Sequence, residues 1–155
     1  MLALSLGLTG ASVAHGQSTT ARLEKNYVEA APQGGLTLTS AGDRAGGLVG
    51  FTVGYARRVS DGFAIGPGLS VFFAVPGIRP TTGYALLLKA MLGDLAVRRL
   101  AFLVEAGGGS QGPAGSYFQA NAGVYLKGFV LKAGYVLYAG AAHTALLSAG
   151  YTFSW

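Results

Sequence analysis

The segment SYFQANAGVYLK, residues 116–127, determines how the rest of the chain is interpreted. Its even-numbered positions from 118 to 126 are all apolar, and its odd-numbered positions from 119 to 127 carry Gln, Asn, Gly, Tyr and Lys. Successive side chains of a β-strand point to opposite faces, so this alternation predicts a strand with one apolar face and one polar face.

The same alternation recurs on both sides of this segment, with turn residues between the repeats. A tight turn at Lys127-Gly128 follows the segment, and Ser60-Asp61-Gly62 forms a second turn signal upstream. Eight strands of about 8–13 residues are predicted, close to the roughly 9–11 residues that a tilted membrane strand requires. Their expected ranges are 34–41, 47–59, 63–74, 82–93, 100–109, 116–127, 129–138 and 144–155.

The composition indicates a membrane protein that does not span with helices. Charged residues make up 11% of the 155 residues and hydrophobic residues 51%, while Gly alone accounts for 26 positions. Soluble domains carry about 25% charged residues, and glycine disfavours helices. The apolar runs are interrupted before they reach the length of a membrane helix, for example by Lys89 and Glu105. A closed barrel is the remaining way to satisfy the backbone inside lipid.

The predicted fold is therefore all-β, a closed eight-stranded antiparallel transmembrane β-barrel spanning residues 34–155. The inward face is expected to be mostly Gly, Ala, Ser and Thr, because a narrow lumen leaves little room. A soluble lipocalin-like barrel would reverse the pattern and place the polar residues outside. The apolar face here is continuous on every strand, which favours the membrane barrel.

The N-terminal region differs from the barrel in its pattern. Residues 1–16 combine an apolar stretch with small residues and Ala14-His15-Gly16, which is typical of a secretory signal peptide, although no basic residue precedes the stretch. The alternative is a first strand, because Leu2, Leu4, Leu6 and Leu8 also alternate with smaller residues. Residues 17–33 lack clean alternation and are predicted to be a periplasmic lead-in to the barrel.

Several stretches resemble a known family. Val53-Gly54-Tyr55, the run from Ser60 to Leu69 and the strands from Phe102 to Trp155 are similar to small outer-membrane β-barrel domain proteins of Gram-negative bacteria. The ending Ala149-Gly150-Tyr151-Thr152-Phe153-Ser154-Trp155 resembles the C-terminal signal read by the barrel-assembly machinery. The resemblance implies an outer-membrane location, contact with lipid and lipopolysaccharide, and an insertion signal at Leu147, Ala149, Tyr151, Phe153 and Trp155.

Charged residues on the predicted inward face form the candidate site. Lys89 and Glu105 are equidistant from the turn centred near residue 97, which makes them direct cross-strand neighbours. The next loop centres near 113 and places Asn121 opposite Glu105. Lys132 projects inward two strands further on, and Arg58 projects inward near the other end of its strand. These five residues form a predicted polar network in the lumen.

The network supports two functions. A structural plug would fill the lumen and fix the strand register, whereas a gated constriction would make the protein a narrow porin-like channel. The plug is preferred, because eight strands enclose little free volume once the lumen is filled. The protein is then a non-enzymatic barrel with a structural or interaction role.

A third possibility is a lipid A-modifying barrel enzyme. His143, beside Thr144, is the histidine that such chemistry would need, but no nucleophile and base with suitable spacing accompany it. No metal or cofactor is expected, because Cys is absent and no cluster of acids and histidines has ligand spacing. The formal charge of +5 comes from scattered basic residues, so no nucleic-acid partner is expected.

Overall fold

The computed structural model describes residues 26–38, 44–74, 82–93, 95, 100–112, 115–139 and 143–155. The predicted signal peptide, 1–16, and the first part of the predicted lead-in, 17–25, lie outside the described residues. So do residues 39–41, the predicted end of the first strand.

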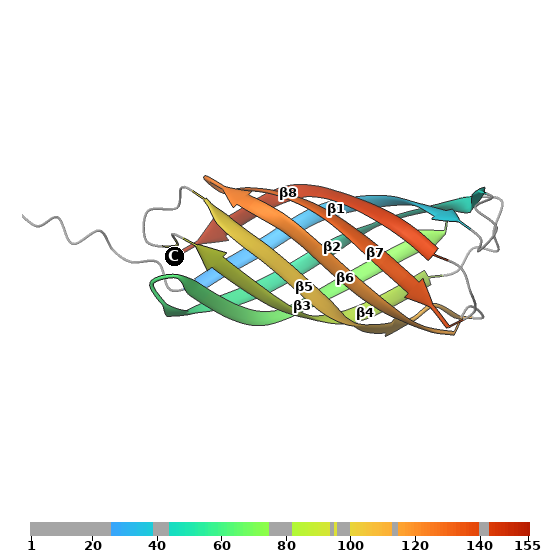
Figure 1. Cartoon of the computed structure of the whole chain (residues 1–155), viewed down its shortest axis with the longest axis horizontal. Helices are drawn as coiled ribbons and strands as arrows, with labels where there is room; N and C mark the ends of the chain where they lie inside the picture. The colour runs from blue at the N-terminus through green and yellow to red at the C-terminus, as the bar shows by residue number, and fades with distance from the viewer. Residues whose placement is uncertain are drawn as a thin grey trace, which may run out of the picture.

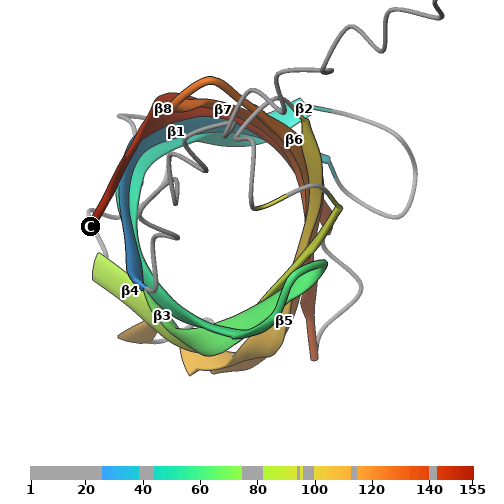
Figure 2. The ribbon, with the colours of Figure 1, turned by 90° about the vertical axis from the view of Figure 1, so that its left-hand side faces the viewer.

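Eight strands pair in chain order, and the last pairs with the first, which closes an antiparallel barrel. The strands run obliquely along the barrel, and an end-on view shows them as a closed ring (Figures 1 and 2). Their bounds are β1 Asn26–Leu38, β2 Arg44–Ser60, β3 Phe63–Ala74, β4 Thr82–Gly93, β5 Ala101–Ser110, β6 Ser116–Leu126, β7 Phe129–Tyr138 and β8 His143–Ser154.

Alternation predicted the bounds of most of these strands to within one residue, but the range predicted for the first strand, 34–41, is wrong. β1 begins at Asn26 and not at residue 34, so residues 26–33 belong to the barrel and not to a lead-in. Their alternation is weak for a physical reason. The outward positions include Ala30 and Pro32, which are only slightly apolar, and the inward positions include a large aromatic residue, Tyr27.

The turn between β6 and β7 matches its prediction. Lys127 and Gly128 both have positive φ angles, 49° and 95°, as a two-residue hairpin with right-handed strand twist requires. Pairing of Leu126 with Phe129 closes the hairpin directly around these two residues. The same end of the barrel carries the other short turn, at Asp61-Gly62, and the C-terminus (Figure 1).

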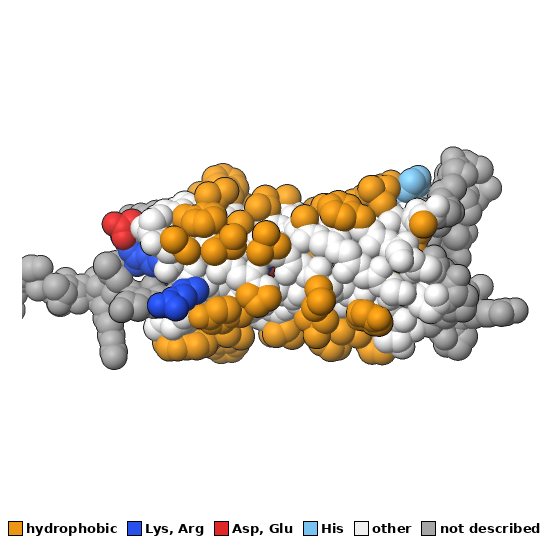
Figure 3. Space-filling model, turned by 90° about the horizontal axis from the view of Figure 1, so that it is seen from below, with side chains coloured by type: hydrophobic (Ala, Val, Ile, Leu, Met, Phe, Trp, Pro, Cys, Tyr) orange, Lys and Arg blue, Asp and Glu red, His pale blue; other side chains and the backbone are white. Residues whose placement is uncertain are grey.

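The outer surface is a belt of large apolar and aromatic side chains. Leu86, Phe129 and Leu147 are each more than 60% exposed, and every strand contributes exposed residues of this kind. On the face shown in Figure 3 they extend along the barrel, and the charged side chains lie at the end that carries the C-terminus. A soluble monomer rarely exposes more than a few hundred Å² of contiguous apolar surface, so this belt faces lipid.

Among the described residues, no helix is long and apolar enough to cross a membrane.

Large apolar side chains fill much of the lumen, which strand alternation alone did not predict. Two groups of buried side chains fill it, one near each end. The termini-side layer comprises Tyr27, Ala56, Ala64, Met91, Leu95, Ala101, Leu103, Tyr125 and Val130. The far-side layer comprises Leu48, Phe72, Ala85, Leu87, Tyr117, Val136 and Leu146. Gly, Ala, Ser and Thr still occupy most of the inward positions, as expected, and the large side chains of the two layers lie between them. The glycines on neighbouring strands make room for these larger residues.

Rings pack against each other within both layers. Tyr27 and Tyr125 meet edge to face with centroids 6.5 Å apart, and the Tyr27 hydroxyl donates to the Leu95 carbonyl at 3.3 Å. In the far-side layer, Tyr117 packs on Phe72 at 6.0 Å. The lumen between the two layers carries the charged residues.

Candidate functional site

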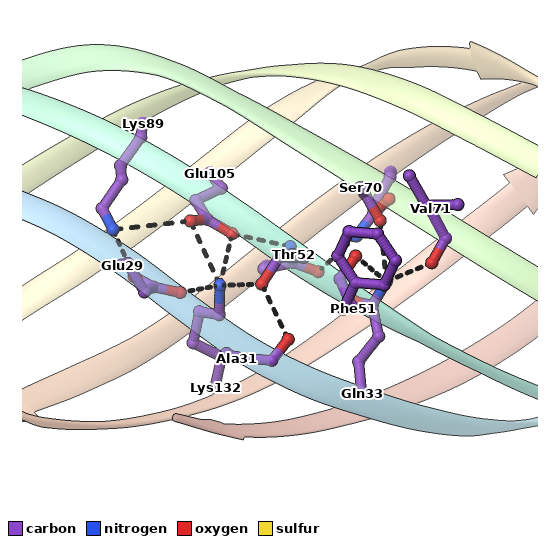
Figure 4. Close-up of polar contacts among 12 residues, drawn as sticks. Glu29, Ala31, Gln33, Phe51, Thr52, Ser70, Val71, Lys89, Glu105 and Lys132 are labelled. Carbon is purple, nitrogen blue, oxygen red and sulfur yellow. Dashed lines mark hydrogen bonds and ion pairs between the residues drawn. The ribbon is translucent and has the colours of Figure 1, made fainter. Parts of the chain in front are cut away.

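Four charged side chains from four different strands meet inside the barrel. Glu29 comes from β1, Lys89 from β4, Glu105 from β5 and Lys132 from β7. Their relative exposures are between 0% and 3%. Figure 4 shows the four side chains converging at one point between the strands. We call this group the ionic cluster.

Acidic and basic groups alternate around the cluster. Lys89 and Lys132 each donate a hydrogen bond to Glu29, one to each carboxylate oxygen. Lys132 Nζ also lies 3.0 Å from Glu105 Oε2, and Lys89 Nζ lies 3.9 Å from Glu105 Oε1. Every charge therefore has two opposite charges beside it, and the four formal charges cancel. Such complete pairing is what makes buried ions tolerable in a low-dielectric interior.

Neutral side chains add further hydrogen bonds to the cluster. Asn121 Nδ2 donates to Glu105 Oε2 at 2.9 Å, and Lys132 Nζ donates to Thr52 Oγ1 at 3.0 Å. Gln119 Nε2 in turn donates to Asn121 Oδ1 at 3.2 Å. The charged groups are thus held by hydrogen bonds from several strands as well as by their mutual attraction.

Glycines on neighbouring strands provide the space for these long side chains. A Cβ atom added at Gly54 would lie 3.1 Å from Lys89 Cδ, and one at Gly134 would lie 2.0 Å from Asn121 Oδ1. Even an alanine at Gly134 would therefore collide with the amide that donates to Glu105. The small inward residues are a packing requirement of the cluster.

The register predicted for two of the strand pairs is confirmed. Lys89 pairs with Glu105, and Glu105 pairs with Asn121, as the turn positions indicated. Lys132 also joins them.

Arg58 does not belong to the network, which corrects its prediction. Its guanidinium binds Asp61 at the rim, in the turn that follows β2. Six residues separate Arg58 from Thr52, the β2 residue that touches Lys132. At about 3.3 Å per residue this is about 20 Å along the strand, beyond the reach of an arginine side chain.

Sequence reasoning missed Glu29, the residue at the centre of the cluster. The signal was present as an imbalance of charge. The predicted network contained two lysines and one glutamate near the middle of the lumen, which would leave one buried positive charge without a partner. A second inward carboxylate was therefore required, and Glu29 is the acid of the described residues that supplies it.

The geometry of the cluster suits a structural role better than a chemical one. Both carboxylates accept hydrogen bonds from lysines, so neither is free to act as a base. Within the described residues, no group of three or more His, Asp or Glu side chains could hold a metal ion.

His143, the candidate for lipid-directed chemistry, lies away from the cluster at the start of β8. Its ring stacks on Tyr135 with centroids 5.6 Å apart and an interplanar angle of 22°. The adjacent Thr144 is buried on the inward side, where its hydroxyl bonds that of Thr37 at 2.8 Å. The two neighbours thus point to opposite faces of β8 and do not form a nucleophile and base pair.

The five residues of the predicted insertion signal all lie on the outer face. Leu147, Tyr151, Phe153 and Trp155 are 42–62% exposed, and Ala149 shares their side of β8. Between them, Ser148 and Thr152 are buried in the lumen. β8 also forms the closing seam with β1, from Tyr27 opposite Ser154 to Leu38 opposite His143.

The closed ring of strands, the apolar outer belt and the filled lumen define a transmembrane β-barrel of the small eight-stranded class. No protein-family model matches the sequence, and a search of curated proteins finds no match. The likeness to solved structures is one of fold.

Several solved outer-membrane proteins share this fold. Ail, the attachment invasion locus protein of Yersinia pestis, aligns with 84% of this chain and 99% of its own, with a TM-score of 0.61 and 12% identity. The N-terminal β-barrel domain of OprF from Pseudomonas aeruginosa has a TM-score of 0.58 and 20% identity, with the same two coverages. Neisserial surface protein A has a TM-score of 0.58 and 15% identity, covering 84% of this chain and 97% of its own.

Proposed function

We propose that this chain is an outer-membrane protein of a Gram-negative bacterium with a structural or interaction role, whose lumen is closed to solutes. It acts through its outer surface, with both termini on the periplasmic side. The fold shared with Ail, OprF and Neisserial surface protein A supports the location. The apolar belt on every strand supports it independently of any comparison.

The observation that carries a closed lumen is the position of the ionic cluster between two apolar layers. A solute that entered from either mouth would meet packed rings and aliphatic side chains before it reached the ionic cluster. Leu95, between β4 and β5, adds to this barrier because its side chain is buried in the termini-side layer. A conducting barrel needs a continuous wetted path, and each layer interrupts it.

Lipid and lipopolysaccharide are the partners that such a surface implies. The barrel-assembly machinery would recognise the outward residues of β8, whose alternation ends in the aromatic pair Phe153 and Trp155. Association with other proteins would use the same outer surface or the loops opposite the termini.

Ion flux through proteoliposomes tests the closed lumen against the narrow channel. Vesicles loaded with a potassium-sensitive dye should respond no faster with the folded protein than without it. A variant with smaller residues in both layers, Phe72→Ala with Leu103→Ala, is the positive control for a lumen that has been opened. Flux through the parent protein that exceeds the protein-free background and equals that of this variant would favour the channel. Loss of acyl chains from added lipopolysaccharide would instead favour the enzyme.

A further inference from the structure

A groove crosses the outer surface of the barrel where β6, β7, β8 and β1 lie side by side. It has a volume of about 740 Å³. Its lining is almost wholly apolar and includes Ala30 and Pro32 of β1, Phe129 and Leu131 of β7, and Ala149 and Tyr151 of β8. The groove opens toward the lipid, because most of these residues belong to the outward face.

The closing seam of the barrel explains why a groove forms here. Between Ala30 opposite Tyr151 and Gln33 opposite Ser148, the pairing of β1 with β8 is interrupted. Pro32 lies in this gap, and it has no N–H group to donate to the neighbouring strand. Small residues, Ala30 and Ala149, meet at the same place, beside larger ones that project further from the barrel.

The termini-side end of the groove carries an aromatic cluster and a cation. The Tyr151 ring packs edge to face on Phe129 at 5.5 Å and on Phe153 at 5.0 Å. It also covers Gly128, where an added Cβ atom would lie 2.8 Å from the Tyr151 hydroxyl. Lys127, the residue before Gly128, is exposed and has no hydrogen-bond or ion-pair partner among the described residues.

We propose that this groove is a binding site for one anionic phospholipid of the periplasmic leaflet. An acyl chain would lie along Ala30, Pro32 and Ala149. The lipid phosphate would meet the Lys127 ammonium and the Tyr151 hydroxyl at the turn between β6 and β7. Aromatic rings of this kind gather at the membrane interface, where headgroups are found. The site rests on the proposed membrane location and on the termini facing the periplasm.

The charge of Lys127 and its position at the end of the groove together determine which lipid the groove should bind. An apolar groove in a membrane surface is filled by hydrocarbon, and the exposed cation at its end distinguishes an anionic headgroup from a zwitterionic one. A basic side chain near a lipid surface contributes about 1 kcal/mol of attraction, which corresponds to about a five-fold preference. Lipopolysaccharide would be expected at the opposite end of the barrel.

Tryptophan quenching by brominated lipids can measure this preference. The chain has one tryptophan, so Trp155→Phe gives a silent background. Leu131→Trp then reports from the edge of the groove, where the native side chain is 52% exposed and a larger ring can extend into lipid. Leu88→Trp is the matched reporter on β4. Both positions precede a lysine of the ionic cluster, so the two reporters lie at a similar depth.

Each reporter is refolded in phosphatidylcholine vesicles that contain increasing fractions of dibrominated phosphatidylglycerol or dibrominated phosphatidylcholine. At Leu131→Trp, the fraction of dibrominated phosphatidylglycerol that gives half-maximal quenching should be about five-fold lower than the fraction of dibrominated phosphatidylcholine that does so. At Leu88→Trp the two curves should coincide. Lys127→Gln should remove the difference at the groove, whereas Arg57→Gln, an exposed cation at the same end on β2, should preserve it.

Two results would overturn the site. Coinciding curves at Leu131→Trp, or an equal preference at both reporters, would mean that the groove holds no particular lipid. Absence of quenching at both reporters, in protein that an unboiled gel shows to be folded, would contradict the membrane location itself. The second result differs visibly from the first, so failure of the site and failure of the proposed function can be told apart.

Discussion

Glu29 of β1 accepts a hydrogen bond from Lys132 of β7, although 103 positions separate them in the chain and β8 lies between their strands. Lys89 of β4 binds the same carboxylate from another side of the barrel. Glu29 therefore joins strands that share no backbone pairing. The first and last parts of the chain are tied together inside the lumen as well as along the closing seam.

Removal of the Glu29 charge should destabilise the barrel strongly. Glu29→Gln leaves Lys89 and Lys132 with one carboxylate between them, and an uncompensated buried charge costs about 3–5 kcal/mol. Urea unfolding of the protein refolded in lipid vesicles measures the change in the free energy of unfolding. Asp61→Asn is the matched control, because it removes an exposed acid from the Arg58 pair and should cost less than about 1 kcal/mol. Similar losses for the two variants would contradict the buried network.

The two carboxylates should not contribute equally. Glu29 hydrogen-bonds both lysines, whereas Glu105 hydrogen-bonds Lys132 and lies 3.9 Å from the Lys89 ammonium. Glu105→Gln should therefore lower the free energy of unfolding less than Glu29→Gln does. Glu105→Leu should lower it further than Glu105→Gln, because Asn121 also loses its acceptor. The same unfolding experiment tests the order, and an equal midpoint for Glu105→Leu and the parent would contradict the pairing.

A double substitution should recover part of the loss. Glu29→Gln combined with Lys89→Met removes one charge of each sign and leaves Glu105 paired with Lys132 at 3.0 Å. The combined loss should be smaller than the sum of the two single losses, by about 0.5–3 kcal/mol. A thermodynamic cycle over the four proteins gives this coupling energy. Strict additivity would show that the two residues do not interact.

Neighbouring phenylalanines on β3 should separate the contributions of the lumen and the lipid face. Phe72 is fully buried in the far-side layer, whereas Phe73 is 46% exposed on the outer face. Phe72→Ala should cost about 3–5 kcal/mol through the cavity it leaves. Phe73→Ala should cost less, because lipid can fill the space. A larger loss for Phe73→Ala would mean that the inward and outward faces are reversed.

The outward aromatic residues at the end of β8 should matter more for assembly than for stability. Phe153 and Trp155 are exposed on the outer face, whereas the ionic cluster lies inside the barrel. Phe153→Ser should reduce the amount of folded protein in the outer-membrane fraction of cells while refolding in detergent remains efficient. Leu86→Ser, at an equally outward position of β4, serves as the comparison. An equal effect of both variants in cells would argue against a specific signal.

Strand positions could be predicted from the sequence wherever the two faces differ strongly. The ranges of β3, β4 and β7 follow directly from alternation, and antiparallel geometry then fixes the pairing of Lys89 with Glu105. β1 could not be located in this way. Its outward side has weak apolar residues at Ala30 and Pro32, so local pattern alone did not separate it from a loop.

The packing of large side chains inside the lumen was also hidden from local pattern. Alternation marks Tyr125 as inward but does not show that Tyr27, from the other end of the chain, packs against it. The two apolar layers depend on which strands become neighbours once the barrel closes. The place of Glu29 could have been inferred from charge balance, whereas the separation of Arg58 from the cluster depends on distance along β2.

Single-channel recording in planar bilayers tests the central claim, that the lumen is closed, most directly. Folded protein, confirmed by an unboiled gel, should insert without producing conductance steps, and Lys89→Ala should leave the trace unchanged because both apolar layers remain in place. Discrete steps from the parent protein that change in size with Lys89→Ala or Glu105→Ala would contradict the account. They would make the ionic cluster the constriction of a pore.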